Sequence, residues 1–165
     1  METSARQLLI VGAMSVHISD SVSFPTVLVV DDNAEMVEFL NLYLSQHGLR
    51  VLSAYSGRQC LEIASRELID LIVLDVMMPG MNGIETCQAL KELPMLRQIP
   101  ILFLTAKDDR NTRLAGIDLG ISEFLPKPIR GRELLERIQT QLAVRQWERE
   151  LDSHSGTTSL DEMRV

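Results

Sequence analysis

From Thr26 onward, short unbroken apolar runs alternate with longer segments in which apolar residues recur every three or four positions. The short runs are typical of strands covered on both faces, and the longer segments are typical of amphipathic helices. The expected strands are residues 27–30, 50–54, 71–75, 100–105 and 123–125. The first expected helix follows Asn33 and ends at His47-Gly48. The second begins at Ser56-Gly57 and has Leu61, Ala64 and Leu68 on one face. The remaining helices are expected over residues 84–93, over 112–119 and from 132 to beyond Trp147.

This alternation predicts an α/β fold. Five strands that alternate with five helices form a parallel sheet with helices on both faces, because right-handed crossovers leave few other topologies. A chain of 165 residues is long enough for one well-buried domain and too short for two of ordinary size. The sequence therefore predicts one doubly wound α/β domain with a tail at each end.

The two ends depart from the pattern. Residues 1–24 are expected to form a flexible arm, although they contain an apolar island, Leu8–Met14. A secretory signal is disfavoured, since Arg6 is the only basic residue before the island and no clear small-residue cleavage site follows. A disordered tail, a true start at Met14 or a strip that docks on the domain remain open. At the other end, residues 145–165 are expected to be a helix end followed by a disordered tail.

Composition narrows the class of protein. Apolar residues make up 45% and charged residues 24% of the chain, which is ordinary for a globular protein and argues against a membrane span. The formal charge of -7 and a pI near 5.0 argue against nucleic-acid binding, which needs a concentrated basic surface. Cys60 and Cys87 lie in expected helices without metal-ligand spacing, and we expect reduced, half-buried thiols.

Polar side chains stand where one expected strand after another ends. They are Asp31, Asp32, Asp75, Thr105 and Lys127. The carboxyl ends of parallel strands share one edge of a sheet, so these groups are expected to converge. Crowded carboxylates favour a cation, and hard oxygen ligands in this small number suit Mg²⁺ better than Ca²⁺. A lysine and a hydroxyl beside the metal suit a phosphoryl group, and a carboxylate is the best nucleophile available.

Together these motifs resemble the response-regulator receiver domains of two-component signalling. The matching stretches cover about residues 26–143 and are Val-Leu-Val-Val-Asp31-Asp32-Asn33, Leu-Asp75-Val-Met-Met-Pro79-Gly-Met-Asn-Gly83, Leu-Thr105-Ala106-Lys107 and Phe124-Leu-Pro-Lys127-Pro128. Each stretch alone is a weak signal, whereas the combination is highly specific. The resemblance implies a flavodoxin-like sheet with strand order 2-1-3-4-5 in a receiver domain over residues 25–144.

The resemblance also assigns chemistry to the strand ends. Asp75 would be the phosphoacceptor, which takes a phosphoryl group from a sensor histidine kinase or a phosphotransfer protein, with help from Thr105 and Lys127. Asp32 and Asp75 would bind Mg²⁺ directly, Asp31 would bind it through water, and the Met77 backbone carbonyl would complete the set. The chain would not be an enzyme beyond its own phosphorylation and slow autodephosphorylation.

The same resemblance implies a conformational switch and identifies the residues that set the lifetime of the phosphoryl group on Asp75. Phosphorylation would draw the Thr105 hydroxyl and the Lys127 ammonium inward, Phe124 would rotate into the vacated space, and the small Ala106 would leave that path open. The positions that modulate lifetime are Met77 and Lys107. Neither is an acid or amide that could orient a water, which predicts a long-lived phosphoryl group. The Lys127-Pro128 bond is expected to be cis.

Partners and location are implied only in outline. The resemblance implies a cytoplasmic protein that meets a kinase or phosphotransfer protein and a downstream protein target, with no nucleic acid and no membrane. About twenty residues follow Val144, too few for a three-helix DNA-binding output, which suggests a stand-alone receiver or a fragment of a longer chain.

The last expected helix carries two apolar stripes on nearly opposite sides. They are Leu135, Ile138 and Leu142, and then Val144, Trp147 and Leu151. The first stripe is expected to pack on the sheet, and the second would allow the 132–151 helix to pair with a partner or a second copy of the chain. A frayed, exposed helix end is the alternative.

Two other functions remain as alternatives. A phosphatase of the haloacid-dehalogenase kind also uses Mg²⁺ and an aspartate nucleophile, but its nucleophile ends the first strand and an acid follows two places on. Here Asn33 stands two places after Asp31. A receiver-like scaffold that works without phosphorylation is the third possibility, and the intact set of Asp, Thr and Lys argues against it.

Overall fold

The computed structural model describes residues 23–106 and 109–155 of the chain. Within them, five strands alternate with five helices. The strands are β1 (Thr26–Val30), β2 (Arg50–Ala54), β3 (Leu71–Asp75), β4 (Ile101–Thr105) and β5 (Glu123–Pro126). The helices are α1 (Ala34–Ser45), α2 (Gly57–Ala64), α3 (Gly83–Glu92), α4 (Arg110–Asp118) and α5 (Gly131–Ser155).

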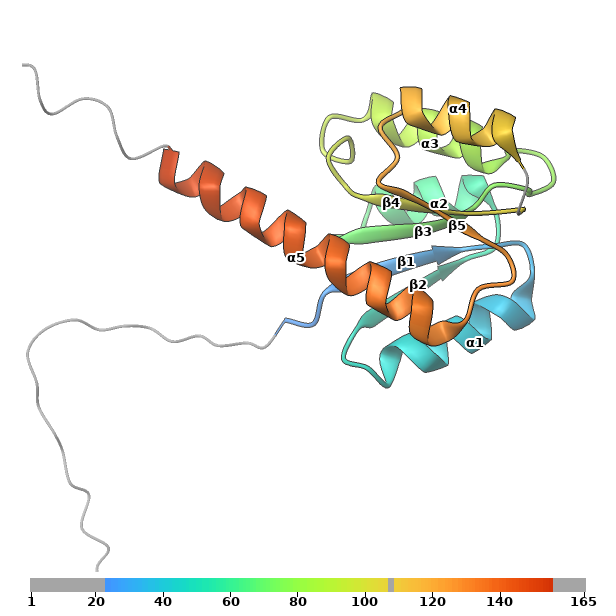
Figure 1. Cartoon of the computed structure of the whole chain (residues 1–165), viewed down its shortest axis with the longest axis horizontal. Helices are drawn as coiled ribbons and strands as arrows, with labels where there is room; N and C mark the ends of the chain where they lie inside the picture. Colours follow the sequence, from blue (N-terminus) through green and yellow to red (C-terminus); the bar gives the residue numbers. More distant parts are fainter. Residues whose placement is uncertain (1–22, 107–108, 156–165) are drawn as a thin grey trace, which may run out of the picture.

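All five strands form one parallel sheet in the order β2-β1-β3-β4-β5. Helices α1 and α5 lie on one face, and α2, α3 and α4 lie on the other (Figure 1). The predicted fold class and strand order are therefore confirmed.

Side chains along the buried strands point alternately to the two faces of the sheet, so a hydrophobic core forms on each face. In β1, Val27 and Val29 pack toward α1 and α5, whereas Leu28 and Val30 pack toward the other helix layer. Every residue of β1, β3 and β4 is buried, because both faces of these central strands are covered. A rigid sheet with helices on both sides is the platform on which the strand ends are held.

Side-chain caps start the helices where the sequence predicts them. The Asn33 side chain accepts a hydrogen bond from the Met36 amide at 3.2 Å and begins α1. Asn82 and Glu85 form a reciprocal capping box at the start of α3. This second cap fixes the far end of the loop that follows Asp75.

Two expectations about side chains are wrong. Leu68 does not share a buried helix face with Ala64, because α2 ends at Ala64 and the chain turns away, which leaves Leu68 86% exposed. Cys60 and Cys87 are free thiols as expected, but both are fully buried rather than half-buried. Burial raises the pKa of Cys60 to about 12 and that of Cys87 to about 11, so both thiols stay protonated.

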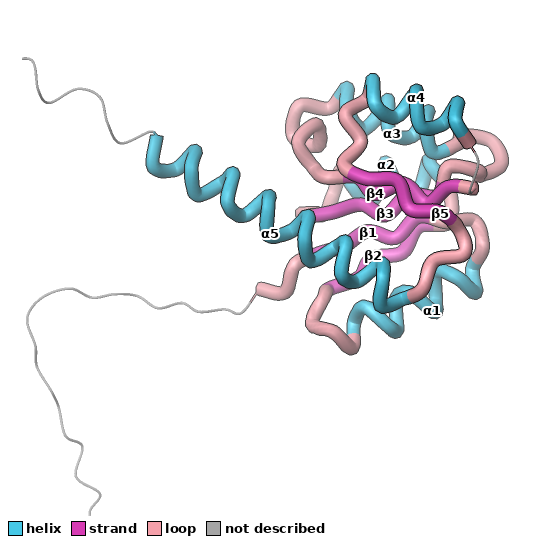
Figure 2. Tube along the Cα trace, in the orientation of Figure 1, coloured by secondary structure: helices cyan, strands magenta, loops and turns pink. Residues whose placement is uncertain are grey.

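Helix α5 runs well past the sheet before it ends (Figure 2). Where it leaves the sheet, the Arg145 guanidinium donates to the Asp70 carbonyl oxygen at 3.0 Å, and Arg149 lies 3.5 Å from the Asp70 carboxylate. The same carboxylate accepts from the Thr26 amide at 2.9 Å, so Asp70 joins the helix to the start of β1. This contact sets the direction in which α5 projects.

The flexible arm expected over residues 1–24 lies mostly outside the described residues, which leave out 1–22. The disordered tail expected from Ser153 begins later than predicted, because α5 continues to Ser155, and the rest of the tail also lies outside the described residues. Across the part of the chain that is described, no helix combines the length and apolar character that a bilayer crossing requires.

Candidate functional site

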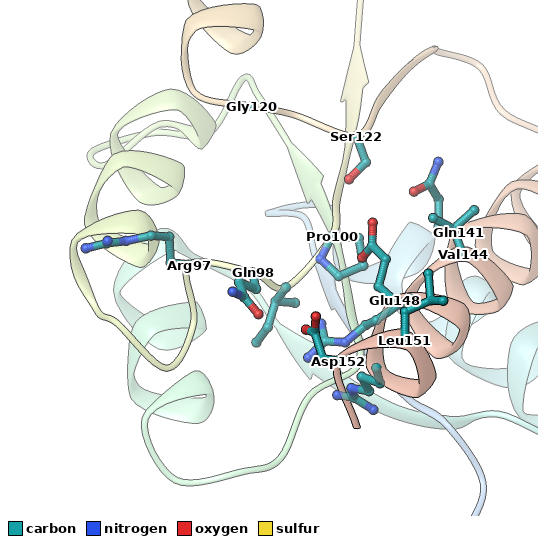
Figure 3. Close-up of a pocket in the computed structure, with 13 residues that line it drawn as sticks. Arg97, Gln98, Pro100, Gly120, Ser122, Gln141, Val144, Glu148, Leu151 and Asp152 are labelled. Atoms are coloured by element: carbon teal, nitrogen blue, oxygen red, sulfur yellow. The ribbon is translucent and has the colours of Figure 1, made fainter. Parts of the chain in front are cut away.

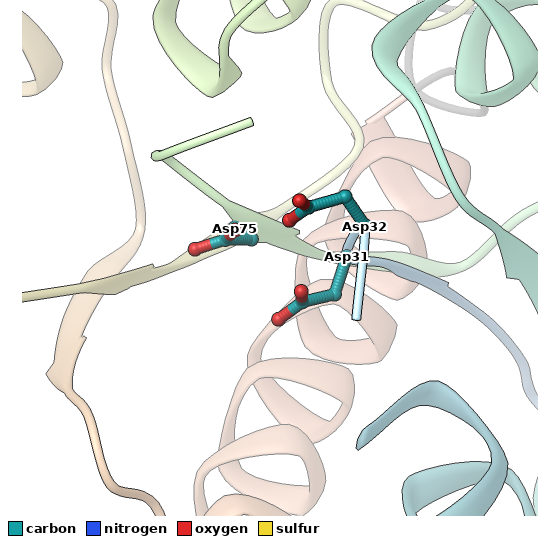
Figure 4. A group of neighbouring side chains, drawn as sticks. All are labelled: Asp31, Asp32 and Asp75. Carbon is teal, nitrogen blue, oxygen red and sulfur yellow. The ribbon is translucent and has the colours of Figure 1, made fainter. Parts of the chain in front are cut away.

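Three carboxylates meet at the carboxyl edge of the sheet. Val30 pairs with Leu74 in the β1–β3 register, so the residues that follow, Asp31 and Asp75, lie side by side. Together with Asp32 they place carboxylate oxygens within 4.8 Å of one another (Figure 4). Asp31 and Asp75 are buried and Asp32 is exposed, which makes the cluster open to solvent on one side.

Lys127 directly follows β5, and its side chain extends toward this cluster. Its ammonium lies 2.8 Å from an Asp31 oxygen and 3.0 Å from an Asp75 oxygen. Its backbone amide donates to the Thr105 carbonyl at 2.8 Å, and the Lys127-Pro128 peptide is cis, as expected. The lysine therefore bridges the two buried carboxylates.

Electrostatics at Asp75 reflect burial and close charges. Burial raises the pKa of the Asp75 carboxyl and the Asp31 charge adds to the rise, while Lys127 and the Met77 backbone N–H oppose it. Burial alone would lower the pKa of Lys127, but its bonds to Asp31 and Asp75 outweigh this and raise it. The ammonium is thus firmly charged, and it partly offsets the effect of burial on the Asp75 carboxyl.

The donor set fits a hard divalent cation. Asp31, Asp32 and Asp75 offer oxygen ligands only. The three carboxylates and the single ammonium of Lys127 carry a formal net charge of -2, which a divalent cation would balance. Such a set of few oxygen donors, exposed on one side so that waters can complete the shell, suits Mg²⁺. The sequence places the same three acids at the metal site.

The loop after Asp75 is fixed by its backbone. The Gly83 amide donates to the Val76 carbonyl at 2.9 Å, and the glycine lies directly against the backbone of Asp75 and Val76. Met77, between them, has an exposed side chain. The role of the Met77 carbonyl as a metal ligand, which the resemblance implies, stays a prediction.

The expected switch residues lie together on the far strands. Thr105 is buried, and its hydroxyl donates to the Ala106 carbonyl at 3.2 Å. Phe124 lies partly buried, edge-on to Phe103 with ring centroids 5.7 Å apart. Lys107 lies outside the described residues. The Thr105 hydroxyl therefore bonds its own backbone neighbour in this state.

Sequence reasoning missed several contacts that support the site. It assigned Lys127 to a phosphoryl group and missed its bond to Asp31. It also missed the Asn33 amide, which donates to Asp31 at 2.9 Å. Spacing could have suggested the second bond, since an amide two residues after an Asp often meets that carboxylate. No pattern in one sequence signals a contact such as Lys127 to Asp31, which spans 96 positions.

Comparison with known families decides the class. The profile of the "Response regulator receiver domain" family matches residues 27–139. The chain belongs to this family. The match covers β1 from its second residue, the other four strands and the first part of α5, and the fold agrees with receiver domains of known structure.

Relatives and solved structures support the same assignment. The transcriptional regulatory protein CpxR of Klebsiella pneumoniae is 39% identical over 136 residues, which are 82% of this chain and 57% of that protein. The response regulator PleD of Caulobacter vibrioides is 42% identical over 69% of this chain and 25% of PleD. The chain thus spans little more than half of CpxR and a quarter of PleD.

Among solved structures, the Vibrio cholerae chemotaxis protein CheY4 superposes with a TM-score of 0.69 at 30% identity, over 72% of this chain and 98% of CheY4. The non-phosphorylated HemR receiver domain of Leptospira biflexa gives a TM-score of 0.66 at 32% identity, over 72% of this chain and 94% of that structure. These receivers share the layered sheet described above.

Proposed function

We propose that this receiver domain is phosphorylated on Asp75 by a sensor histidine kinase or a phosphotransfer protein. The observation that carries the proposal is the buried Asp75 carboxylate, which is bridged to Asp31 by Lys127 inside a cluster of three acids. Three acids gathered at an open edge of the sheet, one of them with a raised pKa, mark a functional site more often than a structural one. The arrangement suits acceptance of a phosphoryl group better than a structural role.

The proposed reaction is a direct transfer. An Asp75 carboxylate oxygen attacks the phosphorus of a phosphohistidine, the P–N bond breaks, and its electron pair leaves with the imidazole nitrogen, which takes up a proton. The product is an acyl phosphate. Lys127, already 3.0 Å from Asp75, would hold a phosphoryl oxygen. Asp32, Asp75 and the Met77 carbonyl would hold Mg²⁺ directly and Asp31 would hold it through water, and the metal would neutralise developing charge.

The signal would leave the site through Thr105. A phosphoryl group on Asp75 offers acceptor oxygens that compete with the Ala106 carbonyl for the Thr105 hydroxyl. Movement of Thr105 toward Asp75 would open space for Phe124, which has Ala106 rather than a bulky residue in its path. A downstream protein would recognise the changed surface near β4 and β5.

A single labelling experiment separates this proposal from its rivals. The chain is incubated with phosphoramidate and Mg²⁺, and wild type is compared with Asp75→Ala. A phosphoacceptor accumulates phosphoryl protein only with Asp75 present. A phosphatase would instead consume the donor continuously and lose activity on replacement of Asp31, and a scaffold would never be labelled.

The lifetime of the acyl phosphate provides a prediction. Met77 cannot orient a water for attack, so we expect the isolated phosphoprotein to last for minutes or longer. Met77→Asn adds an amide beside Asp75 and should speed hydrolysis by about tenfold. Phosphate release from purified phosphoprotein measures both rates. A wild-type half-life of seconds, or equal rates in the two proteins, would contradict this part of the proposal.

The kinase, the output and the location belong to the proposal as well. On the family's pattern we propose a cytoplasmic signalling protein without catalytic turnover of its own beyond slow autodephosphorylation. The net charge of -7 makes DNA a poor partner for the chain itself.

We also propose that α5 pairs with α5 of a second copy. Val144 is 49% and Trp147 70% exposed, and with Leu151 they follow one another at spacings of three and four, as in the seam of a helix pair. Val144 and Leu151 also line a cavity of about 580 Å³ between α5 and the loops near Pro100 and Ser122 (Figure 3).

Truncation tests the pairing. A chain that ends at Ala143 keeps Leu135, Ile138 and Leu142 on the sheet but loses the exposed stripe. We expect the full chain to dimerise at micromolar concentration and the truncated chain to be monomeric in sedimentation equilibrium. Trp147→Ala in the full chain is the matched variant and should weaken the dimer by about tenfold or more. Equal association of all three proteins would contradict self-pairing.

A further inference from the structure

The Phe124 ring rests on a helix residue that has no side chain. A Cβ built on Gly116 of α4 would overlap the ring, at 2.7 Å from Cε1 and closer still to Cζ. The same Cβ would come within 3.1 Å of the Ile121 side chain. Gly116 is buried and its φ is not in the left-handed region, so backbone freedom does not explain a glycine here. A close approach of the ring to the helix does.

Two residues contact the ring. Gly116 lies against its tip, and Phe103 packs edge-on to it with ring centroids 5.7 Å apart. Phe103 pairs with Phe124 across β4 and β5, and Thr105 lies two residues on, on the same face of β4 as Phe103. The ring thus lies against α4, diagonally across from Thr105, while the Thr105 hydroxyl donates to the Ala106 carbonyl.

We infer that Gly116 is a positioning residue that stabilises the resting place of the Phe124 ring and so sets the balance between the resting and phosphorylated arrangements. The inference rests on the proposed phosphorylation of Asp75 and names its regulation. A side chain at this position would occupy the space on α4 in which the Phe124 ring lies, and it would not contact Asp75, Thr105 or Lys127. Because the overlapping atoms are at the far end of a side chain, the ring moves rather than the backbone. The arrangement in which Thr105 has moved toward Asp75 and the ring fills the vacated space then becomes favoured.

Linkage gives the sign of the effect. Destabilising the resting arrangement raises the population of the other one, so any ligand that prefers the phosphorylated arrangement binds more tightly. Beryllofluoride, a tetrahedral mimic of a phosphoryl group on a carboxylate, is such a ligand. Gly116→Ala should therefore tighten beryllofluoride binding, although it lies on α4 and does not contact the acids.

The test is a double-mutant cycle on the full chain with saturating Mg²⁺, in which bound beryllofluoride is followed by fluorine NMR. Gly116→Ala should tighten binding by about fivefold. In a Phe124→Ala background the same substitution should change binding by no more than about twofold, because there is no ring to displace. Asp118→Ala, an exposed change on α4 that also raises helix propensity, controls for stabilisation of the helix and should leave binding unchanged.

A direct measurement on the wild type completes the test and does not depend on a variant folding. A nuclear Overhauser contact between the Phe124 ring and the Gly116 Hα should be present in the free protein and lost with saturating beryllofluoride. Unchanged or weaker binding by Gly116→Ala, an equal shift in both backgrounds, or a contact that persists when beryllofluoride is bound would overturn the role of Gly116. A wild type that binds no beryllofluoride at all would overturn the phosphoacceptor proposal itself.

Discussion

A chain with Asn in place of Asp75 is expected to take up no phosphoryl group from phosphoramidate, a loss of about a thousandfold or more. The amide has nearly the size of the carboxylate but is not a nucleophile, so the attacking atom is removed while the site keeps its shape. Lys127 retains its 2.8 Å bond to Asp31, so the fold around the site should persist. Intact-protein mass spectrometry after labelling measures the loss.

Two controls make the result specific. Wild-type chain with Mg²⁺ removed by chelation should be labelled far more slowly. Without the metal, the negative charge of the three acids repels the anionic phosphoryl group of the donor. Asp70→Asn is a matched acid substitution at the opposite edge of the sheet, where Asp70 bonds Thr26 and α5, and it should be labelled at the wild-type rate. Normal labelling of Asp75→Asn would contradict the assignment of the phosphoacceptor.

Gly83→Ala is expected to destabilise the fold by about 3 kcal/mol. A Cβ on Gly83 would lie 2.7 Å from the Val76 Cα and would overlap the Asp75 carbonyl oxygen, both of which are backbone atoms that cannot swing aside. The loop would have to move away from β3, and the Met77 carbonyl would move with it. Urea unfolding should show the lost stability, and Mg²⁺ binding should weaken in the same variant.

Gly80→Asn is the matched control for that prediction. Gly80 lies in the same loop, has a φ of +72° and has open space where a Cβ would stand. Asn tolerates this conformation better than most residues, so the cost should stay below about 1 kcal/mol. Equal destabilisation by the two substitutions would mean that the loop, rather than the contact between Gly83 and β3, limits stability.

The layout of the fold follows from local pattern. Apolar runs such as 71–75 are covered on both faces in the structure, and caps such as Asn33 start helices where the pattern changes. In a parallel sheet, strand ends necessarily share an edge, so the meeting of Asp31, Asp32 and Asp75 is predictable from the sequence.

Other features depend on contacts that no local pattern carries. Leu68 continues the apolar spacing of α2, but the helix stops one turn earlier, and spacing alone cannot tell where a helix ends. The bond of Lys127 to Asp31 joins opposite parts of the sequence. The absence of a side chain at Gly116 acquires meaning only once the Phe124 ring is seen against it.

The most direct test of the central claim is to locate the phosphoryl group in the wild-type chain. After labelling with phosphoramidate and Mg²⁺, borohydride converts an aspartyl phosphate to homoserine, which peptide mass spectrometry identifies by position. If Asp75 is the phosphoacceptor, homoserine appears in the peptide that carries Asp75 and not in the peptide that carries Asp31 and Asp32. Homoserine in the latter peptide, or steady consumption of the donor with no homoserine in either, would contradict it.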